Sequence, residues 1–199
     1  MTLITLASTS SGRKKLLDDA GIDFLTFAPG VDEEALVEQK QPGSVCEMTL
    51  LLARAKAEAG AEKVQTQFVL GCDSALEFEG KNLGKPLTAD VATERWREMR
   101  GKFGHLHSGH HLIDLISGQS RSVCSSTLVR FANLTDDEIE AYVASGEPLN
   151  VAGSFTIDGR GGPFIESIEG DYHTVVGLSL VELRRMLMEL GRSITELWR

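Results

Sequence analysis

The chain opens with the stretch that decides its fold, Leu3-Ile4-Thr5-Leu6-Ala7-Ser8-Thr9-Ser10-Ser11-Gly12-Arg13. Residues 3–7 form a short apolar run, which is typical of a buried strand. The hydroxyl side chains that follow are suited to cap a helix, and residues 13–17 continue as that helix. A strand that passes directly into a helix predicts an α/β domain.

The rest of the chain repeats this alternation of strand-like and helix-like segments. A hydroxyl residue followed three positions later by Glu predicts helices at Ser44, Thr135 and Ser179, and a further helix is expected over residues 88–100. Apolar runs predict a strand over residues 67–71, which ends at Cys72-Asp73-Ser74, and a strand pair over residues 112–115 and 122–131. Since the sequence shows no internal repeat or linker, we expect a single domain over residues 1–199.

The composition excludes several classes of protein. Of the 199 residues, 42% are apolar and 25% are charged, which argues against disorder. Twenty Lys and Arg residues face 29 Asp and Glu residues, and the net charge of −9 repels polymeric nucleic acid and anionic lipid. The N-terminus reads as a strand rather than a signal peptide, and no apolar run approaches the ~20 residues of a membrane span. We therefore expect a cytoplasmic protein without a polymeric nucleic-acid partner or a membrane.

Cysteines and histidines give weak signals for metal or redox chemistry. Cys46, Cys72 and Cys124 are odd in number and far apart, which predicts neither a disulfide framework nor a thiolate zinc site. No activating partner is indicated for Cys72, so we expect a small buried residue there. The histidines at positions 105, 107, 110 and 111 are close together but have no recognised metal-ligand spacing, so zinc is the weaker interpretation.

Asp73 and the first strand-to-helix turn are stronger candidates for a site. Asp73 follows an apolar strand, where a carboxylate either activates water and holds a divalent cation or caps a turn. Ser8, Ser10 and Arg13 stand at a helix start, which offers N–H groups and a bidentate cation to a phosphate. The same residues also suit an ordinary helix cap, and the sequence leaves both interpretations open.

Two lysines and one glycine-rich loop complete the candidates. Lys56 lies among alanines, and Lys85 stands between Gly84 and Pro86; each is either a phosphate ligand or a solvated residue. The stretch around Lys85 is one residue short of a nucleotide-binding P-loop, and Pro86 replaces its metal-binding hydroxyl, so a P-loop enzyme is rejected. The glycine-rich loop at residues 159–164 either approaches a ligand or turns a hairpin.

The order of these motifs resembles the Maf family of nucleoside triphosphate pyrophosphatases over roughly residues 3 to 190. The matching segments are Leu6-Ala7-Ser8-Thr9-Ser10-Ser11-Gly12-Arg13, Val31-Asp32-Glu33, Leu52-Ala53-Arg54-Ala55-Lys56-Ala57, Leu70-Gly71-Cys72-Asp73-Ser74, Leu83-Gly84-Lys85-Pro86, Tyr142-Val143-Ala144-Ser145-Gly146-Glu147-Pro148, Ala152-Gly153, Gly170-Asp171-Tyr172 and Val175-Val176-Gly177-Leu178. Each motif is weak alone, and the order of so many of them carries the resemblance.

The resemblance implies a Maf/ITPase-like α/β fold with a long, curved mixed sheet, surrounding helices and a cleft between two lobes. It implies hydrolysis of a nucleoside triphosphate to the monophosphate and pyrophosphate, which removes non-standard or surplus nucleotides. Asp73 would be the proton acceptor, joined by Glu33 at a divalent cation, Mg²⁺ or Mn²⁺. The phosphate ligands would be Arg13, Lys56 and Lys85, assisted by Ser8 and Ser10. A homodimer is compatible with this assignment.

The chain departs from the common family pattern at Val151, where many relatives carry Lys, at Asp158, where they commonly have Gln, and near Gly104, where they have a His. These segments are expected to face the base, so the motifs leave the preferred nucleotide open. A second hypothesis is a nucleotide-binding regulator that acts through a protein partner in cell-division arrest. The carboxylates at positions 33 and 73 favour the enzyme, because a pure binder needs no acid pair beside its phosphate site.

Overall fold

The fold class predicted from the sequence is confirmed by the computed structural model, which describes residues 3–199. Over this range the chain forms one α/β domain with seven strands in a mixed, open sheet and seven α-helices. The strands are β1 (Ile4–Ala7), β2 (Phe24–Phe27), β3 (Phe68–Phe78), β4 (Lys81–Leu83), β5 (Phe103–Asp114), β6 (Ser120–Phe131) and β7 (Ile165–Glu169). The helices are α1 (Ser11–Asp19), α2 (Glu33–Lys40), α3 (Val45–Ala61), α4 (Ala89–Met99), α5 (Asp136–Ala144), α6 (Tyr172–Val176) and α7 (Leu180–Glu189).

The sheet has the order β2-β1-β3-β5-β6-β7, and β4 pairs with β3. Strand β1 is parallel to both of its neighbours, with Ile4 opposite Phe24 on one side and Phe68 on the other. The β3–β4 and β6–β7 pairs are antiparallel. Parallel strands at one edge require helical crossovers, which α1 and the α2–α3 segment supply.

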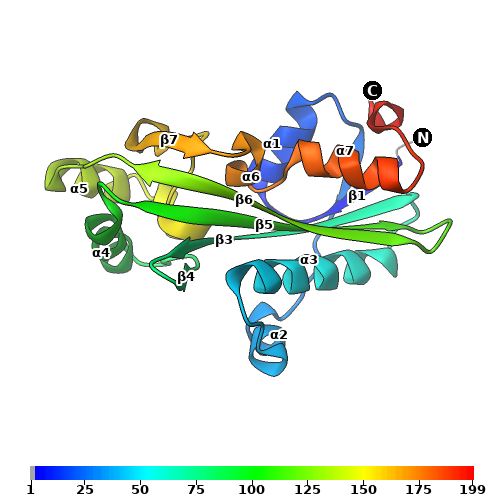
Figure 1. The fold of residues 1–199 in the computed structure, drawn as a ribbon, viewed down its shortest axis with the longest axis horizontal. Coiled ribbons are helices and arrows are strands. Elements are labelled where there is room, and N and C mark those ends of the chain that lie inside the picture. The colour runs from blue at the N-terminus through cyan, green and yellow to red at the C-terminus, as the bar shows by residue number, and fades with distance from the viewer. Residues whose placement is uncertain (1–2) are drawn as a thin grey trace. The chain divides into compact units, whose positions relative to one another are not determined.

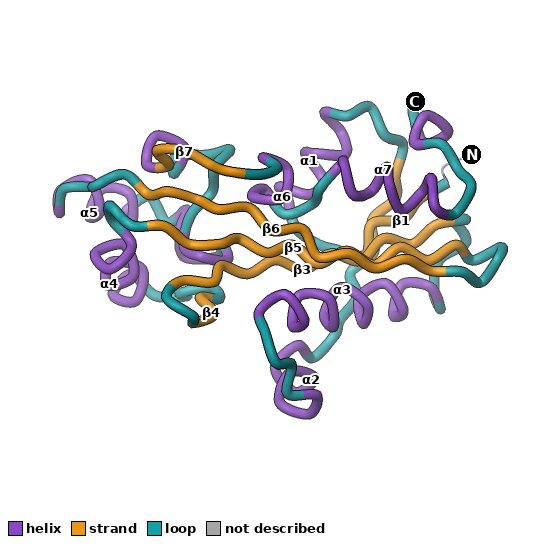
Figure 2. The backbone as a smooth tube through the Cα atoms, in the orientation of Figure 1, coloured by secondary structure: helices purple, strands orange, loops and turns teal. Residues whose placement is uncertain are grey.

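The chain divides into two compact units, and β3, β5 and β6 each contribute residues to both. The first unit comprises the chain up to Asp73, Ser108–Ser125 and Gly177–Arg199. Within it, α3 covers one face of the sheet while α1 and α7 cover the other (Figure 1). A tight turn joins the ends of β5 and β6 in the same unit (Figure 2), where Asp114 accepts hydrogen bonds from the Ile116 N–H and the Ser117 hydroxyl.

Two glycines allow α3 to approach the sheet closely. A Cβ atom at Gly71 would lie 2.0 Å from the Ala53 carbonyl oxygen, and one at Gly109 would lie 2.4 Å from that of Thr49. Any side chain at either position would therefore push the helix away from β3 or β5. This close packing places α3 side chains directly over the middle of β3.

The second unit comprises Ser74–His107 and Ser126–Val176 and is built around Trp96. Trp96, on α4, is fully buried. Its ring makes edge-to-face contacts with Phe131, Tyr142 and Phe164, at centroid distances of 5.7, 5.5 and 6.0 Å. Such aromatic pairs add about 0.5–1.5 kcal/mol each beyond the area they bury. The Trp96 indole N–H donates to the Ser154 carbonyl at 2.8 Å, so its polar atom is also satisfied.

Several element boundaries differ from those predicted. The strand expected to end at Gly71 continues through Cys72 and Asp73 to Phe78, because a lysine partner allows a carboxylate to lie inside the strand. Strand β5 begins at Phe103 rather than near Leu112. Strand β2 and helix α2 were not predicted; both are short, and neither contains a fully buried side chain.

One disulfide links Cys46, at the start of α3, to Cys124 in β6. Their Cα atoms are 6.0 Å apart although they are separated by 78 residues in the sequence. The prediction of no disulfide framework missed this pair, because sequence spacing does not show that α3 begins beside β6. Among the described residues, no helix is both long and apolar enough to cross a membrane.

Candidate active site

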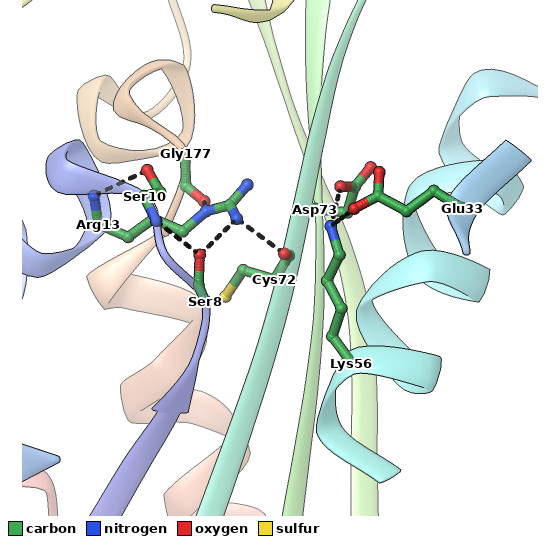
Figure 3. A network of polar contacts seen from close by, with 8 residues as sticks. All are labelled: Ser8, Ser10, Arg13, Glu33, Lys56, Cys72, Asp73 and Gly177. Atoms are coloured by element: carbon green, nitrogen blue, oxygen red, sulfur yellow. Dashed lines mark hydrogen bonds and ion pairs between the residues drawn. The ribbon is translucent and has the colours of Figure 1, made fainter. Parts of the chain in front are cut away.

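The middle of β3 presents Asp73 to a lysine from α3 and a glutamate from α2. The close approach of α3 to Gly71 brings Lys56 onto this strand. The backbone of Ala53 and Ala57, on either side of Lys56 in the helix, occupies the space that a Cβ atom on Gly71 would need. Glu33 is the first residue of α2, where a carboxylate is favoured by the positive end of the helix dipole. Three segments that are distant in sequence thus converge on one point (Figure 3).

The Lys56 ammonium bridges the two carboxylates. Its Nζ lies 2.6 Å from Asp73 Oδ1 and 2.8 Å from Glu33 Oε1. The Lys56 and Asp73 side chains are buried, at 9% and 11% exposure, whereas the Glu33 side chain is 49% exposed. Because burial weakens solvent screening, the Lys56–Asp73 pair is the stronger of the two, and Glu33 is the member that water reaches.

A second polar network surrounds the Arg13 guanidinium. Its Nε donates to the Gly177 carbonyl at 2.8 Å, and its Nη1 donates to the Cys72 carbonyl at 2.8 Å and to the Ser8 hydroxyl at 3.2 Å. Ser10 is the N-cap of α1 and accepts from the Arg13 N–H at 3.4 Å. Arg13 is only 8% exposed, so these contacts hold a charged group inside the unit.

The two networks meet consecutive residues of β3. Arg13 contacts the backbone of Cys72. On the other side of the strand, the Asp73 side chain belongs to the ion-paired group that it forms with Lys56 and Glu33 (Figure 3). The Cys72 thiol is buried, and burial raises its pKa to about 12 despite the nearby cations Arg13 and Lys56. The thiol therefore stays neutral, in agreement with the prediction of a small buried residue.

Of the predicted site residues, the structure brings together Asp73, Glu33 and Lys56, and separately Arg13, Ser8 and Ser10. Lys85 belongs to the second unit, where it is exposed in the loop between β4 and α4. That loop is fixed by Arg95, whose Nη1 donates to the Gly84 carbonyl at 2.5 Å. The positions that depart from the family pattern also lie in this unit. A Cβ at Gly104 would meet the Glu77 carbonyl at 2.9 Å, which explains the absence of a larger residue there.

The sequence analysis gave no role to Glu147, which organises a loop of the second unit. Its carboxylate accepts hydrogen bonds from the Tyr142 hydroxyl at 2.9 Å, the Thr156 hydroxyl at 2.5 Å, and the N–H groups of Arg160 and Gly161 at 2.9 and 3.0 Å. Burial alone would raise the Glu147 pKa, but these hydrogen bonds outweigh it and the pKa is lowered. The signal was the glycine-rich loop itself, whose backbone N–H groups need an acceptor.

Comparison with known proteins reveals relatives over nearly the whole chain. A family model described as "Maf-like protein" matches residues 3–190. A Streptomyces coelicolor protein named nucleoside triphosphate pyrophosphatase is 51% identical over 197 residues, which cover 98% of this chain and 94% of the relative. Proteins with the same name occur in Salinispora tropica, with 51% identity over 98% of this chain and 87% of the relative, and in Trichormus variabilis, with 43% identity over 100% and 98%.

Proposed function

This chain belongs to the Maf family, as its motifs predict, and we propose that it is a nucleoside triphosphate pyrophosphatase that releases a nucleoside monophosphate and pyrophosphate. The names of its relatives support this activity. The single structural observation that carries it is the Lys56 ammonium between the Asp73 and Glu33 carboxylates. A buried base beside a cation suits the hydrolysis of a polyanion, in which charge neutralisation and positioning do most of the catalytic work.

A divalent cation, Mg²⁺ or Mn²⁺, fits the same residues. The ammonium marks a position where a positive charge lies between two carboxylates, and both ions prefer oxygen ligands of this kind. Asp73 and Glu33 would hold the ion. When bound, it would neutralise phosphate charge and orient the triphosphate.

The protein's own residues supply the proton transfer and the phosphate contacts in this proposal. Water adds to a phosphorus atom of the α–β anhydride, the anhydride P–O bond breaks, and the water proton passes to the Asp73 carboxylate. Arg13, Lys56 and Lys85 bind phosphate oxygens, and Ser8 and Ser10 add hydroxyl contacts. Lys56 also fixes the position of the Asp73 carboxylate through its contact of 2.6 Å with Oδ1.

The remaining parts of the proposal concern the cell. We infer that the substrates are non-standard or surplus nucleotides and that the enzyme works in the cytoplasm. The net charge of −9 supports a free nucleotide rather than a polymeric nucleic acid as its partner, because the many phosphates of a polymer would be repelled, whereas a triphosphate needs only a few local cations. A homodimer is compatible with this proposal.

A product assay with a panel of triphosphates tests the proposal. Purified protein is incubated with standard and modified nucleoside triphosphates and with Mg²⁺, Mn²⁺ or excess chelator, and pyrophosphate and orthophosphate are measured separately. We expect pyrophosphate with either ion and none with chelator. Orthophosphate as the first product would indicate a phosphatase, and tight binding without turnover would support the regulatory alternative.

A further inference from the structure

His110 is a fully buried histidine of β5 that the proposed mechanism does not use. Its Nε2 accepts a hydrogen bond from the Ser179 backbone N–H at 2.8 Å, in buried surroundings. An imidazole nitrogen accepts only when it carries no proton, so His110 is neutral and its proton resides on Nδ1. A buried side chain thus fixes one backbone group at the start of α7.

Ser179, whose N–H binds His110, lies two residues after Gly177, whose carbonyl binds Arg13. The Gly177 carbonyl accepts the Arg13 Nε–H at 2.8 Å, and Gly177 has a φ of 123°, a conformation that favours glycine. On its other side, Ser179 caps α7 by accepting the Glu182 N–H with its hydroxyl at 3.1 Å. The segment from Gly177 to Ser179 therefore connects β5, α7 and Arg13, and all of these residues belong to the first unit.

We propose that His110 is a positioning residue for Arg13, acting through the Gly177–Ser179 segment. Loss of the imidazole acceptor would leave the Ser179 N–H buried and unsatisfied, which is costly enough to displace the segment. The Gly177 carbonyl would move with it and release the Arg13 Nε–H. The guanidinium would then keep its charge but lose the orientation set by its contacts to Gly177 and Cys72. The catalytic consequence rests on the proposed function, in which Arg13 binds the triphosphate.

The neighbouring His111 provides a matched control. It is also buried in β5, at 3% exposure, and its Nδ1 forms a hydrogen bond with the Ser122 hydroxyl at 2.6 Å. Consecutive residues of a strand point to opposite faces, so His111 faces away from His110. Replacing His111 removes a buried imidazole from the same strand without touching the Ser179 N–H.

Three variants separate positioning from general packing. His110→Leu removes the acceptor at similar volume, His110→Gln places a carbonyl oxygen near the original Nε2 position, and His111→Leu is the control. Hydrogen exchange of the Arg13 Nε–H is followed by NMR, and the KM and kcat for triphosphate hydrolysis are measured. A fourth variant, His110→Leu combined with Arg13→Lys, tests whether the two residues act on the same contact.

We expect His110→Leu to accelerate Arg13 Nε–H exchange at least tenfold and to lower kcat/KM about tenfold, the effect of one charge-assisted hydrogen bond. His110→Gln should restore both values to within about threefold of wild type, and His111→Leu should leave both unchanged. The double variant should cost no more than about twofold beyond Arg13→Lys alone. If His110→Leu does not fold, His110→Asn replaces it, because its side chain is too short to reach the Ser179 N–H.

Unchanged Arg13 Nε–H exchange in a folded variant without the acceptor would overturn the proposal, and so would losses in the double variant that simply add. Equal losses in His110→Gln and His110→Leu would overturn it as well. Because the exchange measurement needs no substrate, it tests the positioning role even if wild-type protein releases no pyrophosphate. Absence of pyrophosphate release would reject the proposed function and leave the positioning role standing.

Discussion

Replacing Lys56 with methionine removes the ammonium between Asp73 and Glu33 while keeping the length of the side chain. The Asp73 carboxylate then remains in a strand at 11% side-chain exposure, without the cation that lies 2.6 Å away in the wild type. An uncompensated buried charge is far more costly than a neutral group in the same place. We therefore expect Lys56→Met to destabilise the folded protein through Asp73 rather than through lost packing.

The magnitude follows from the burial of the two partners. Breaking a buried ion pair by removing one member typically costs about 3–5 kcal/mol. We expect the lower end, about 3 kcal/mol, because the 49% exposure of Glu33 shows that water approaches one side of the group. A second substitution, Asp73→Asn in the Lys56→Met background, removes the orphaned charge and should restore about 2 kcal/mol.

Urea unfolding followed by circular dichroism, with chelator present so that no metal ion replaces the ammonium, measures these free energies. Lys15→Met is the control, since Lys15 pairs with Asp19 on the surface, where both side chains are more than half exposed. It should show no measurable loss. Wild-type stability in Lys56→Met, or a double variant no more stable than Lys56→Met, would refute the reasoning from buried charge.

Three further substitutions test the site and the Glu147 loop. Asp73→Asn should lower turnover by about 10²–10⁴-fold in a protein whose circular dichroism is unchanged, because the general base is lost while the side-chain volume is kept; turnover close to wild type would exclude Asp73 as the base. Arg13→Lys should lower kcat/KM for triphosphate, raising the activation free energy by about 2–4 kcal/mol, while inhibition by monophosphate changes less, since a lysine cannot reproduce the planar contacts of the guanidinium; equal weakening of both would indicate a structural role. Glu147→Gln should lower the free energy of unfolding by about 1–3 kcal/mol near neutral pH. Because the Glu147 pKa is lowered by folding, its contribution is present above the ordinary value of 4.5 and is lost as pH falls through the folded-state pKa, so the two proteins should converge in acid unfolding titrations.

The elements predicted from sequence are those whose signals are local. Ser44 caps α3 by accepting the Glu47 N–H, and Thr135 forms both hydrogen bonds of a capping box with Glu138. Such contacts span three residues and can be read directly from the sequence. Strand β2 and α2 gave no comparable signal, because the β2 side chains are only partly buried and α2 has no apolar face.

Position in the sequence indicated Asp73 and Arg13 as candidates, whereas Glu33 and the role of each residue came only from the family resemblance. Nothing local shows that residues 33, 56 and 73 meet, since the contact depends on how α2 and α3 return to β3. The polar residues after Gly71 were interpreted as the end of a strand, because an unpaired carboxylate is unfavourable in a buried one. Gly71 was the available signal: a glycine within an apolar strand often marks the close approach of another backbone, which here is α3.

The three members of the ion-paired group lie on segments that differ in how much buried packing holds them. Asp73 lies in a central strand, and Lys56 lies on a helix packed tightly over two glycines. Glu33 stands on α2, which contributes no buried side chain to the described structure. Segments with little apolar burial open at low free-energy cost, so α2 can move while β3 and α3 stay in place. Separating Glu33 from Lys56 would therefore disturb no buried side chain of α2, whereas moving Lys56 or Asp73 would disturb the packing of α3 on β3.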